Sequence, residues 1–179
     1  MKIAITGHSS GIGKAIADAY PLVVGFSRGN GYDISDPKTI DRILEEIDDC
    51  DVFVNNAHSG NAQLQIFQKL LKKWRDDNTK TIVNINSKTI YNKPNNRQYT
   101  TEKKFLRSAA IDAINDIERK CRVININVGY VTTSRVSHLI GKQPMLFPEE
   151  IATMIKWCID KPLNIEVGEL SVWSKDIMV

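Results

Sequence analysis

A glycine-rich segment near the start of the chain, TGHSSGIG (6–13), has the composition of a turn that binds a phosphate group. It joins a short β-rich run, KIAIT (2–6), to a run of helix-forming residues at 12–20. Glycine destabilises regular structure, so three glycines at such a junction indicate that the backbone must come close to something. A helix N-terminus offers unpaired N–H groups and about half a positive charge, which suits an anion. The segment therefore predicts a phosphate-binding turn, although a plain loop can have the same composition.

Tyr99 and Lys103 form a pair whose spacing suits proton transfer. They lie four residues apart in a stretch with helical periodicity, so both side chains occupy one face, about one turn apart. A free phenol has a pKa of about 10 and is a poor base at neutral pH. An ammonium about 4 Å away contributes roughly 4 kcal/mol toward the phenolate at an effective dielectric constant of about 20. Tyr99 is therefore a candidate general acid or base, although such pairs also occur by chance on helix surfaces.

The elements that must position these residues alternate along the chain. Apolar, strand-forming runs predict strands at 2–6, 22–27, 51–57, 80–87, 122–129 and 168–174. Helical periodicity and helix start signals predict helices at 12–20, 37–47, 61–76, 99–119 and 148–160. Nearly continuous apolar strands separated by helices predict an α/β fold, a doubly wound, mostly parallel Rossmann-type sheet in three layers with helices on both faces. We expect one domain (1–179), because no linker or repeat interrupts the pattern.

Two helix boundaries rest on particular residues. Asp36 and Pro37 have the residue types of an N-cap and a first helical position, which predicts that a helix starts there. In the helix predicted over 99–119, apolar residues from Leu106 to Ile117 recur at helical spacing, so we expect Ile117 to pack inward.

Charge and hydropathy exclude several function classes. The net charge is +3, and the densest basic cluster, Lys72, Lys73 and Arg75, lies at the polar end of an amphipathic helix. That position indicates a solvated face, so we expect no nucleic-acid partner. No apolar run is long enough to span a membrane, and Met1 leads directly into a strand. We therefore expect a cytoplasmic protein with no leader segment and no membrane partner.

The thiols and imidazoles of the chain lack the spacing of a metal site. The three cysteines are widely separated and odd in number, which predicts reduced and mostly buried thiols, Cys50, Cys121 and Cys158. The three histidines are equally isolated, so we expect no metal.

Two segments, in their order along the chain, resemble the coenzyme motifs of the short-chain dehydrogenase/reductase family. TGHSSGIG (6–13) is similar to the family's TGxxxGIG. NNAH (55–58) is similar to its NNAG, with His58 where glycine is usual. The resemblance spans nearly the whole chain, and it implies a nicotinamide coenzyme whose pocket His8 and His58 help to shape.

The catalytic motifs of the same family have counterparts later in the chain. NINS, which ends at Ser87, resembles the segment with the catalytic serine, and YTTEK (99–103) resembles the YxxxK pair. By this resemblance, Ser87 orients the substrate oxygen and Tyr99 transfers the proton. Lys103 lowers the pKa of Tyr99 and holds the nicotinamide ribose. The family's fourth catalytic residue is an asparagine early in the helix before the fourth strand, for which Asn61 is the best match.

The end of the second strand bears on the choice of coenzyme. A coenzyme without a 2′-phosphate is usually gripped by an acid about twenty residues past the first glycine. Here that position holds Ser27, followed by Arg28. A guanidinium pairs well with a phosphate, so NADP(H) is favoured over NAD(H), unless Arg28 is an ordinary surface arginine.

The complete coenzyme set combines the glycine turn with positions that the resemblance implies. In the family, an Asp after the second strand contacts the adenine, and Asp33 followed by Ile34 resembles it. NVGYVTT (127–133) resembles a segment with Pro-Gly, Val128 replacing the proline. The expected coenzyme-binding residues are Thr6, Gly7, Ser9, Ser10, Gly11, Ile12, Gly13, Ser27, Arg28, Asp33, Ile34, Asn55, Asn56, Ala57, Tyr99, Lys103, Val131 and Thr132.

The segment between Gly129 and the last helix is shorter than the substrate-covering region of the family. We therefore expect an open or small pocket, which a second subunit could complete. The candidate substrate-side residues, which are alternatively loop anchors, are Tyr130, Met145, Leu146 and Phe147. By resemblance, a homodimer forms through the helices at 61–76 and 99–119.

These observations predict an NADP(H)-dependent oxidoreductase that transfers hydride between the nicotinamide and a small-molecule carbonyl or alcohol. The alternative is a coenzyme-binding regulatory or scaffold protein without turnover. His58, Val128 and the short substrate segment favour that alternative, whereas the intact serine, tyrosine and lysine argue against it. A nucleotide-sugar epimerase or dehydratase is disfavoured, because the chain lacks room for a separate substrate domain.

Overall fold

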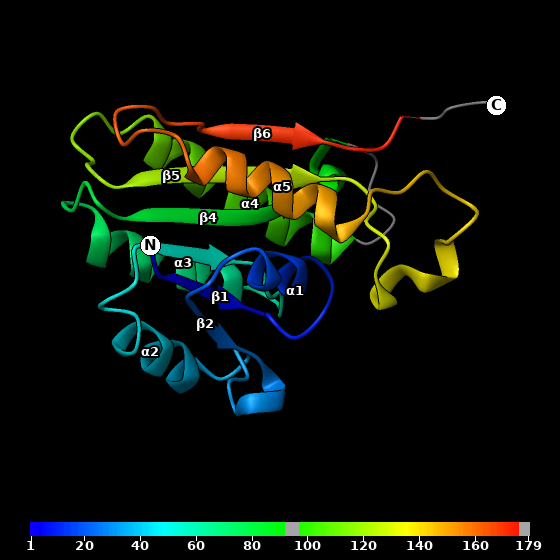
Figure 1. Ribbon diagram of the computed structural model, residues 1–179, viewed down its shortest axis with the longest axis horizontal. Coiled ribbons are helices and arrows are strands. Elements are labelled where there is room, and N and C mark those ends of the chain that lie inside the picture. The colour runs from blue at the N-terminus through cyan, green and yellow to red at the C-terminus, as the bar shows by residue number, and fades with distance from the viewer. Residues whose placement is uncertain (92–96, 176–179) are drawn as a thin grey trace.

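The structure is a computed structural model that describes residues 1–91 and 97–175 (Figure 1). Its strands are β1 (Ile3–Thr6), β2 (Val23–Phe26), β3 (Val52–Asn55), β4 (Thr81–Ser87), β5 (Arg122–Val128) and β6 (Glu169–Val172). Its α-helices are α1 (Gly11–Asp18), α2 (Pro37–Glu45), α3 (Ala62–Trp74), α4 (Arg97–Ile114) and α5 (Pro148–Ile159). Short 3-10 helices are η1 (Arg28–Asn30), η2 (Lys88–Tyr91) and η3 (Ser134–Leu139). Every strand and helix expected from the sequence is present.

The six strands form one parallel sheet in the order β2-β1-β3-β4-β5-β6. The chain leaves β1 in one direction to reach β2 and later returns to the other side of β1 to form β3. This reversal is the switch point of a doubly wound sheet, and ligands bind beyond the carboxyl ends of the strands at such a point. One strand, β2, lies between β1 and the near edge of the sheet, whereas the Rossmann strand order 3-2-1-4-5-6 has two strands in that position.

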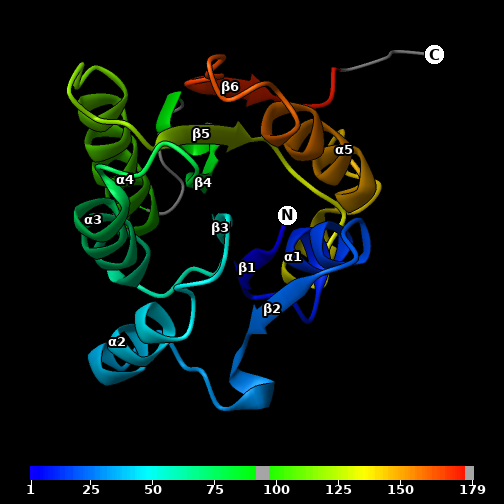
Figure 2. The ribbon, with the colours of Figure 1, turned by 60° about the vertical axis from the view of Figure 1, so that its left-hand side comes forward.

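Helices cover both faces of the sheet, which gives three layers (Figure 2). Helices α1 and α5 pack together on one face, and α2, α3 and α4 cover the other. Successive side chains of β1 point to opposite faces, as the period of a strand requires. Ile3 and Ile5 belong to the core beneath α1 and α5, whereas Ala4 belongs to the core beneath the other three helices. The predicted α/β fold with a doubly wound parallel sheet is confirmed.

The start of α2 is confirmed, and the end of α4 is not where the sequence placed it. Asp36 Oδ1 accepts a 3.0 Å hydrogen bond from the N–H of Lys38, and Pro37 is the first helical residue. Helix α4 ends at Ile114 because Asp116 forms a turn, in which its Oδ1 accepts the N–H of Glu118 at 3.1 Å. Ile117 therefore lies outside the helix and is 98% exposed, so the expectation that it packs inward is wrong.

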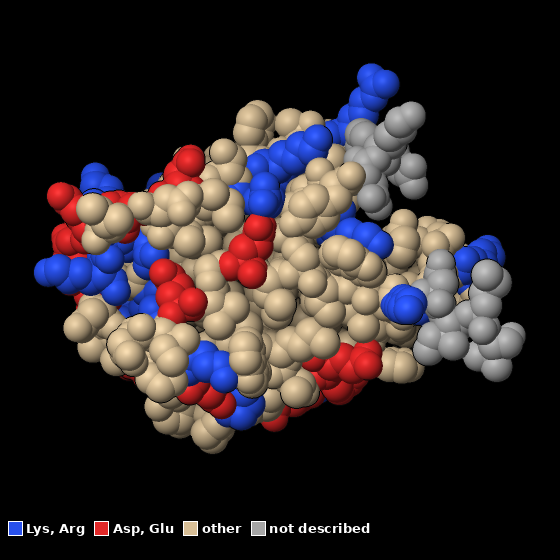
Figure 3. All heavy atoms as spheres, turned by 90° about the horizontal axis from the view of Figure 1, so that it is seen from above, with Lys and Arg blue, Asp and Glu red and all other residues tan. Residues whose placement is uncertain are grey.

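The distribution of charged side chains on the surface and the burial of the cysteines agree with the sequence-based expectation. Basic and acidic side chains are interspersed over the face in Figure 3, as expected for a solvated surface. All three cysteines are buried and free, as the sequence predicted. Among the described residues, no helix has the length and apolar character needed to span a membrane.

Candidate active site

The glycine turn (Gly7–Gly13) connects β1 to α1 and brings the backbone into tight contact with itself. Gly7 has a φ of +73° and Gly11 a φ of +54°, a region that side chains with a Cβ rarely adopt. A Cβ on Gly13 would lie 2.1 Å from the carbonyl oxygen of Gly7. The N-terminus of α1 can thus approach the loop closely, and its free N–H groups face the space beyond the sheet.

A cavity of about 1610 Å³ opens at this turn and extends past the carboxyl ends of β1, β3, β4 and β5. Figure 1 shows the chain between β5 and α5 beyond the ends toward which the strand arrows point. The expected site residues that line it are Gly7, Ser9, Ser10, Gly11, Ile12, Ser27, Arg28, Asp33, Ile34, Asn56, Ala57, Ser87, Tyr99, Lys103 and Val131. The glycine turn and the serine, tyrosine and lysine thus face one cavity, although they come from distant parts of the sequence.

Three expected residues lie behind the cavity wall and hold it in place. Thr6 is fully buried, and its Oγ1 accepts the N–H groups of Asn56 and Ala57, both at 3.0 Å. Asn55 is also fully buried, and its Nδ2 donates to the carbonyl of Gln63 at 2.8 Å. Gly13 packs against the loop as described above. These residues join β1, β3 and α3 around the site.

The structure brings Thr133 to the cavity in place of Thr132. Thr132 is not among the lining residues, and its Oγ1 lies 3.9 Å from Met145 Sδ. Thr133 lines the cavity, and its Cγ2 would lie 3.0 Å from a Cβ on Gly11. Of the four substrate-side candidates, Tyr130 lines the cavity. Met145 contacts Thr132, Leu146 is buried, and Phe147 precedes α5 as its N-cap.

Helix α4 positions the tyrosine and the lysine beside the end of β4. Asn86 of β4 fixes the helix to the sheet, because its Nδ2 donates to the carbonyl of Lys103 at 3.1 Å. Ser87, the last residue of β4, forms a side-chain hydrogen bond with Tyr99. Lys103 Nζ lies 5.6 Å from the centroid of the Tyr99 ring. The three side chains expected to carry the chemistry are therefore together.

Gln63, which the sequence analysis did not single out, anchors the lysine. Its Oε1 accepts a 2.6 Å hydrogen bond from Lys103 Nζ, and its Nε2 donates to the carbonyls of Asn55 at 2.6 Å and Ile85 at 2.9 Å. Asn61, the expected fourth catalytic residue, is the exposed N-cap of α3 and is not among the residues that line the cavity. A signal was present: Gln63 continues the inward stripe of α3 formed by Ile66, Phe67, Leu70 and Trp74. A polar residue in an apolar stripe indicates a buried partner.

The pKa values of Tyr99 and Lys103 differ from the sequence-based expectation. Burial raises the pKa of Tyr99, and the groups that act against this are Ser87 and Arg135, not Lys103. Lys103 is almost fully buried, and burial lowers its pKa to about 7, with the positive charge of Arg135 acting in the same direction. The prediction that Lys103 lowers the pKa of Tyr99 is therefore wrong for the groups of this chain alone. Desolvation by burial is the largest cause of both shifts.

His58 lines the cavity, as expected of a pocket-shaping residue, and it has a partner that the sequence did not reveal. Its Nε2 lies 2.8 Å from Glu102 Oε2, and its ring packs edge-on against Tyr99 with centroids 4.8 Å apart. Burial is the main cause that lowers the pKa of His58, followed by the charge of Lys103. This histidine therefore favours its neutral form and packs as a wall beside the tyrosine. Among the described residues, no group of acidic, histidine and cysteine side chains has the arrangement of a metal site.

Comparison with known proteins gives the fold. No protein-family model matches the chain, and no curated protein matches it in sequence. Among solved structures, it is similar to a 3-ketoacyl-(acyl-carrier-protein) reductase from Brucella melitensis complexed with NADH, with a TM-score of 0.79 and 21% identity over 96% of each chain. An alcohol dehydrogenase from the archaeon Thermococcus sibiricus complexed with 5-hydroxy-NADP gives a TM-score of 0.71 and 21% identity, over 96% of both chains.

A third similar structure is a ribose-5-phosphate isomerase from Brucella melitensis 16M, with a TM-score of 0.77 and 15% identity. The similarity covers 96% of this chain and 90% of the isomerase chain. This chain has a Rossmann-type fold. Because the similar structures have different names and low identities, the reaction must be argued from the site itself.

Proposed function

We propose that the chain is a shortened member of the short-chain dehydrogenase/reductase family, in which residues 1–179 form one dinucleotide-binding catalytic domain. Its proposed reaction is the NADP(H)-dependent transfer of hydride between the nicotinamide and a carbonyl or alcohol substrate. One observation carries the proposal: Ser87, Tyr99 and Lys103 line the same cavity as the glycine turn. The oxidoreductases among the similar structures, two of them bound to nicotinamide coenzymes, support it.

The residues at the glycine turn fit a dinucleotide. Side chains on Gly7 and Gly13 would collide with Asn56, Ala57 or the loop backbone, so the turn stays open for a pyrophosphate at the N-terminus of α1. Ser10, the N-cap, makes no side-chain capping bond to the described first turn, and its hydroxyl is available to a ligand. Arg28 lines the cavity at the end of β2, where it favours the 2′-phosphate of NADP(H).

The protein groups have complementary tasks in carbonyl reduction. The coenzyme, when bound, supplies the hydride. Ser87 holds the substrate oxygen, and Tyr99 donates a proton to that oxygen as the negative charge develops. The raised pKa of Tyr99 keeps the phenol protonated at neutral pH, which suits an acid. Lys103, fixed by Gln63 and the carbonyl of Ile85, presents its ammonium to the ribose.

We also propose a homodimer through the outer faces of α3 and α4. Phe105 on α4 is 58% exposed, and Arg107 and Ile111 of α4 line, together with Tyr91 of η2, a hollow of about 300 Å³. The buried, unpaired thiols support a reducing, cytoplasmic location.

Turnover tests the proposed function. Purified protein should oxidise NADPH in the presence of some member of a panel of aldehydes, ketones and quinones, and Tyr99→Phe should slow this by about 100-fold or more. Tyr91→Phe is the matched control, because the Tyr91 hydroxyl bonds to Ser171 Oγ outside the cavity. If the protein binds NADPH but reduces no carbonyl, and Tyr99→Phe changes nothing, the non-catalytic coenzyme-binding alternative is correct.

A further inference from the structure

Arg135 is a cation of the cavity that the proposed reaction does not use. It lies in η3, the short helix between β5 and α5, and its side chain is exposed while lining the cavity with Tyr99 and Lys103. Among the described residues, Arg135 has no hydrogen bond or ion pair. A guanidinium that faces a large cavity without a partner is available to a ligand.

The charge of Arg135 acts on the catalytic centre. It lowers the pKa of Tyr99, Lys103 and His58 alike. Tyr99 and Lys103 lie on α4, His58 lies between β3 and α3, and Tyr99 is the hydrogen-bond partner of Ser87. Arg135 therefore lies near the place where the substrate oxygen is proposed to bind, and not only at the outer rim of the cavity.

Several other charged groups of this region have partners. Glu102 pairs with His58 at 2.8 Å and accepts from Gln98 at 3.1 Å. Lys103 donates to Gln63, and Lys88 lies over the Trp173 ring at 4.4 Å. The lining carboxylate, Asp33, lies after β2 near Arg28, where Ser35 donates two hydrogen bonds to it. Apart from Asp33, the charged residues that line the cavity are basic (Arg28, Lys88, Lys103, Arg135 and Lys175), and the Arg135 guanidinium has no partner within the described part of the chain.

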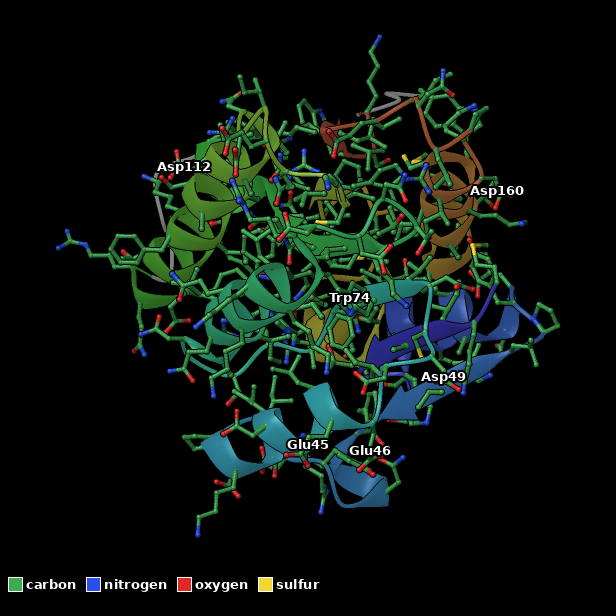
Figure 4. All side chains as sticks on the ribbon, turned by 90° about the vertical axis from the view of Figure 1, so that its left-hand side faces the viewer. Glu45, Glu46, Asp49, Trp74, Asp112 and Asp160 are labelled. Carbon is green, nitrogen blue, oxygen red and sulfur yellow. The ribbon has the colours of Figure 1, made fainter. Side chains whose placement is uncertain are left out.

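Several acidic side chains lie at the other end of the sheet, away from the cavity. Figure 4 looks onto the end of the sheet where the strands begin, opposite the cavity, and the labelled acids Glu45, Glu46, Asp49 and Asp160 lie there. Three of these acids are paired with neighbouring cations, Glu46 with Arg42, Asp49 with Lys2 and Asp160 with Lys156, so the positive character of the cavity rests on its own lining residues.

We propose that the substrate carries an anionic group, a carboxylate or a phosphate, which the Arg135 guanidinium binds while Ser87 and Tyr99 hold the carbonyl oxygen. This inference rests on the proposed function and narrows its substrate class. The planar fork of arginine matches two oxygens of either group, and such charge-assisted hydrogen bonds are worth roughly twice a neutral one. An alternative partner for Arg135 is the pyrophosphate of the coenzyme, and the experiment separates the two.

Matched substrate pairs provide the test. Succinic semialdehyde is compared with its methyl ester, and glyceraldehyde 3-phosphate with glyceraldehyde, so that each pair differs in the anionic group. We expect the protein to favour the anionic member of at least one pair by about 10-fold or more in kcat/KM, since a charge-assisted hydrogen bond contributes about 1.5–3 kcal/mol. The favoured pair identifies the group as carboxylate or phosphate.

Variants of the same segment locate the effect. Arg135→Gln should abolish the preference, mainly by raising KM for the anionic substrate, and Arg135→Lys should retain part of it. Lys142→Gln is the control, because it removes a nearby exposed positive charge that is not part of the cavity lining. An unchanged preference in Arg135→Gln, an equal loss in Lys142→Gln, or a Kd for NADPH raised as much as the substrate KM would overturn the inference.

A binding measurement separates this inference from the proposed function. Calorimetric titration of the NADP⁺-loaded protein with succinate and with inorganic phosphate should show binding of one of them, lost in Arg135→Gln. Binding without turnover of any carbonyl would contradict the proposed reaction and keep the anion site. Turnover of uncharged carbonyls, with no binding of either anion, would contradict the anion site and keep the reaction.

Discussion

Lys103 Nζ donates a 2.6 Å hydrogen bond to Oε1 of Gln63, a residue forty positions earlier in the chain. Gln63 is itself held by two backbone carbonyls at the ends of β3 and β4. The buried ammonium of Lys103 is therefore held by the side-chain amide of Gln63, whose own hydrogen bonds restrict its rotation. This contact makes Gln63 a positioning residue for the lysine.

Replacing Gln63 should impair the reaction through Lys103. Gln63→Leu removes the acceptor, and we expect kcat/KM to fall by about 10–100-fold, since a hydrogen bond to a charged group is worth about 1.5–3 kcal/mol. Gln63→Glu places a carboxylate beside the ammonium and should raise the pKa of Lys103, which moves the basic limb of the pH–rate profile upward. Gln65→Glu makes the same change on the exposed face of α3 and should move nothing. If the pH–rate profile of Gln63→Glu does not shift, Gln63 has only a packing role and does not position Lys103.

The lowered pKa of Lys103 should also appear in the pH dependence of stability. Its folded-state pKa is about 7, below the ordinary value of 10.5, so between these values the unfolded chain binds more protons. The free energy of unfolding must then rise with pH over this window, with a slope of at most about 1.4 kcal/mol per pH unit from this one group.

Lys103→Met lacks the titrating group, so the stability of the natural chain relative to this variant should increase from neutral pH upward. Chemical denaturation of both proteins across the window measures it. A difference that is flat or falls with pH would mean that the ammonium keeps its ordinary pKa.

The glycine turn should tolerate no side chain at Gly13. A Cβ there would lie 2.1 Å from Gly7 O and 2.7 Å from Asn56 Nδ2. Overpacking typically costs about 1–3 kcal/mol, and we expect Gly13→Ala at or above the upper end because backbone must move. Gly29→Ala is the control, since a Cβ on Gly29 would lie 3.7 Å from its nearest neighbouring atom, Ser27 Oγ. Equal melting temperatures for the two variants would contradict this account of the turn.

Arg28 should set the preference between the two nicotinamide coenzymes. In Arg28→Gln we expect the Kd of NADPH to rise by about 10–100-fold, because the variant loses a charge-assisted hydrogen bond to the 2′-phosphate. The Kd of NADH should hardly change, because NADH lacks this phosphate. NADH binding is the internal control for folding of the pocket. A parallel loss of both coenzymes would assign Arg28 a structural role, and no loss would make it an ordinary surface arginine.

Most of the fold and the main site residues could be predicted from the sequence. The strands are apolar runs with clear ends, and Asp36 and Pro37 mark a helix start that the structure confirms. The glycine turn, Ser87, Tyr99 and Lys103 share one cavity because a parallel sheet brings the carboxyl ends of its strands together. Local patterns suffice for such features.

The features that sequence reasoning missed depend on packing between distant segments. Gln63 rather than Asn61 reaches Lys103, because the phase of α3 turns position 63 inward. The choice between Thr132 and Thr133 depends on how one loop leaves the sheet. The pKa of Tyr99 depends on how deeply α4 buries it, which spacing in a helix does not reveal.

The central claim is that Tyr99 protonates a carbonyl oxygen while hydride comes from a nicotinamide bound at the glycine turn. Single-turnover reduction of an aldehyde with NADPH deuterated at both C4 positions tests it most directly, with the label followed by mass spectrometry. We predict one deuterium on the product carbon, delivered from one face of the nicotinamide, and a rate lowered by about 100-fold or more in Tyr99→Phe with unchanged NADPH affinity. Product without the label, or a Tyr99→Phe variant as fast as the natural chain, would contradict the account.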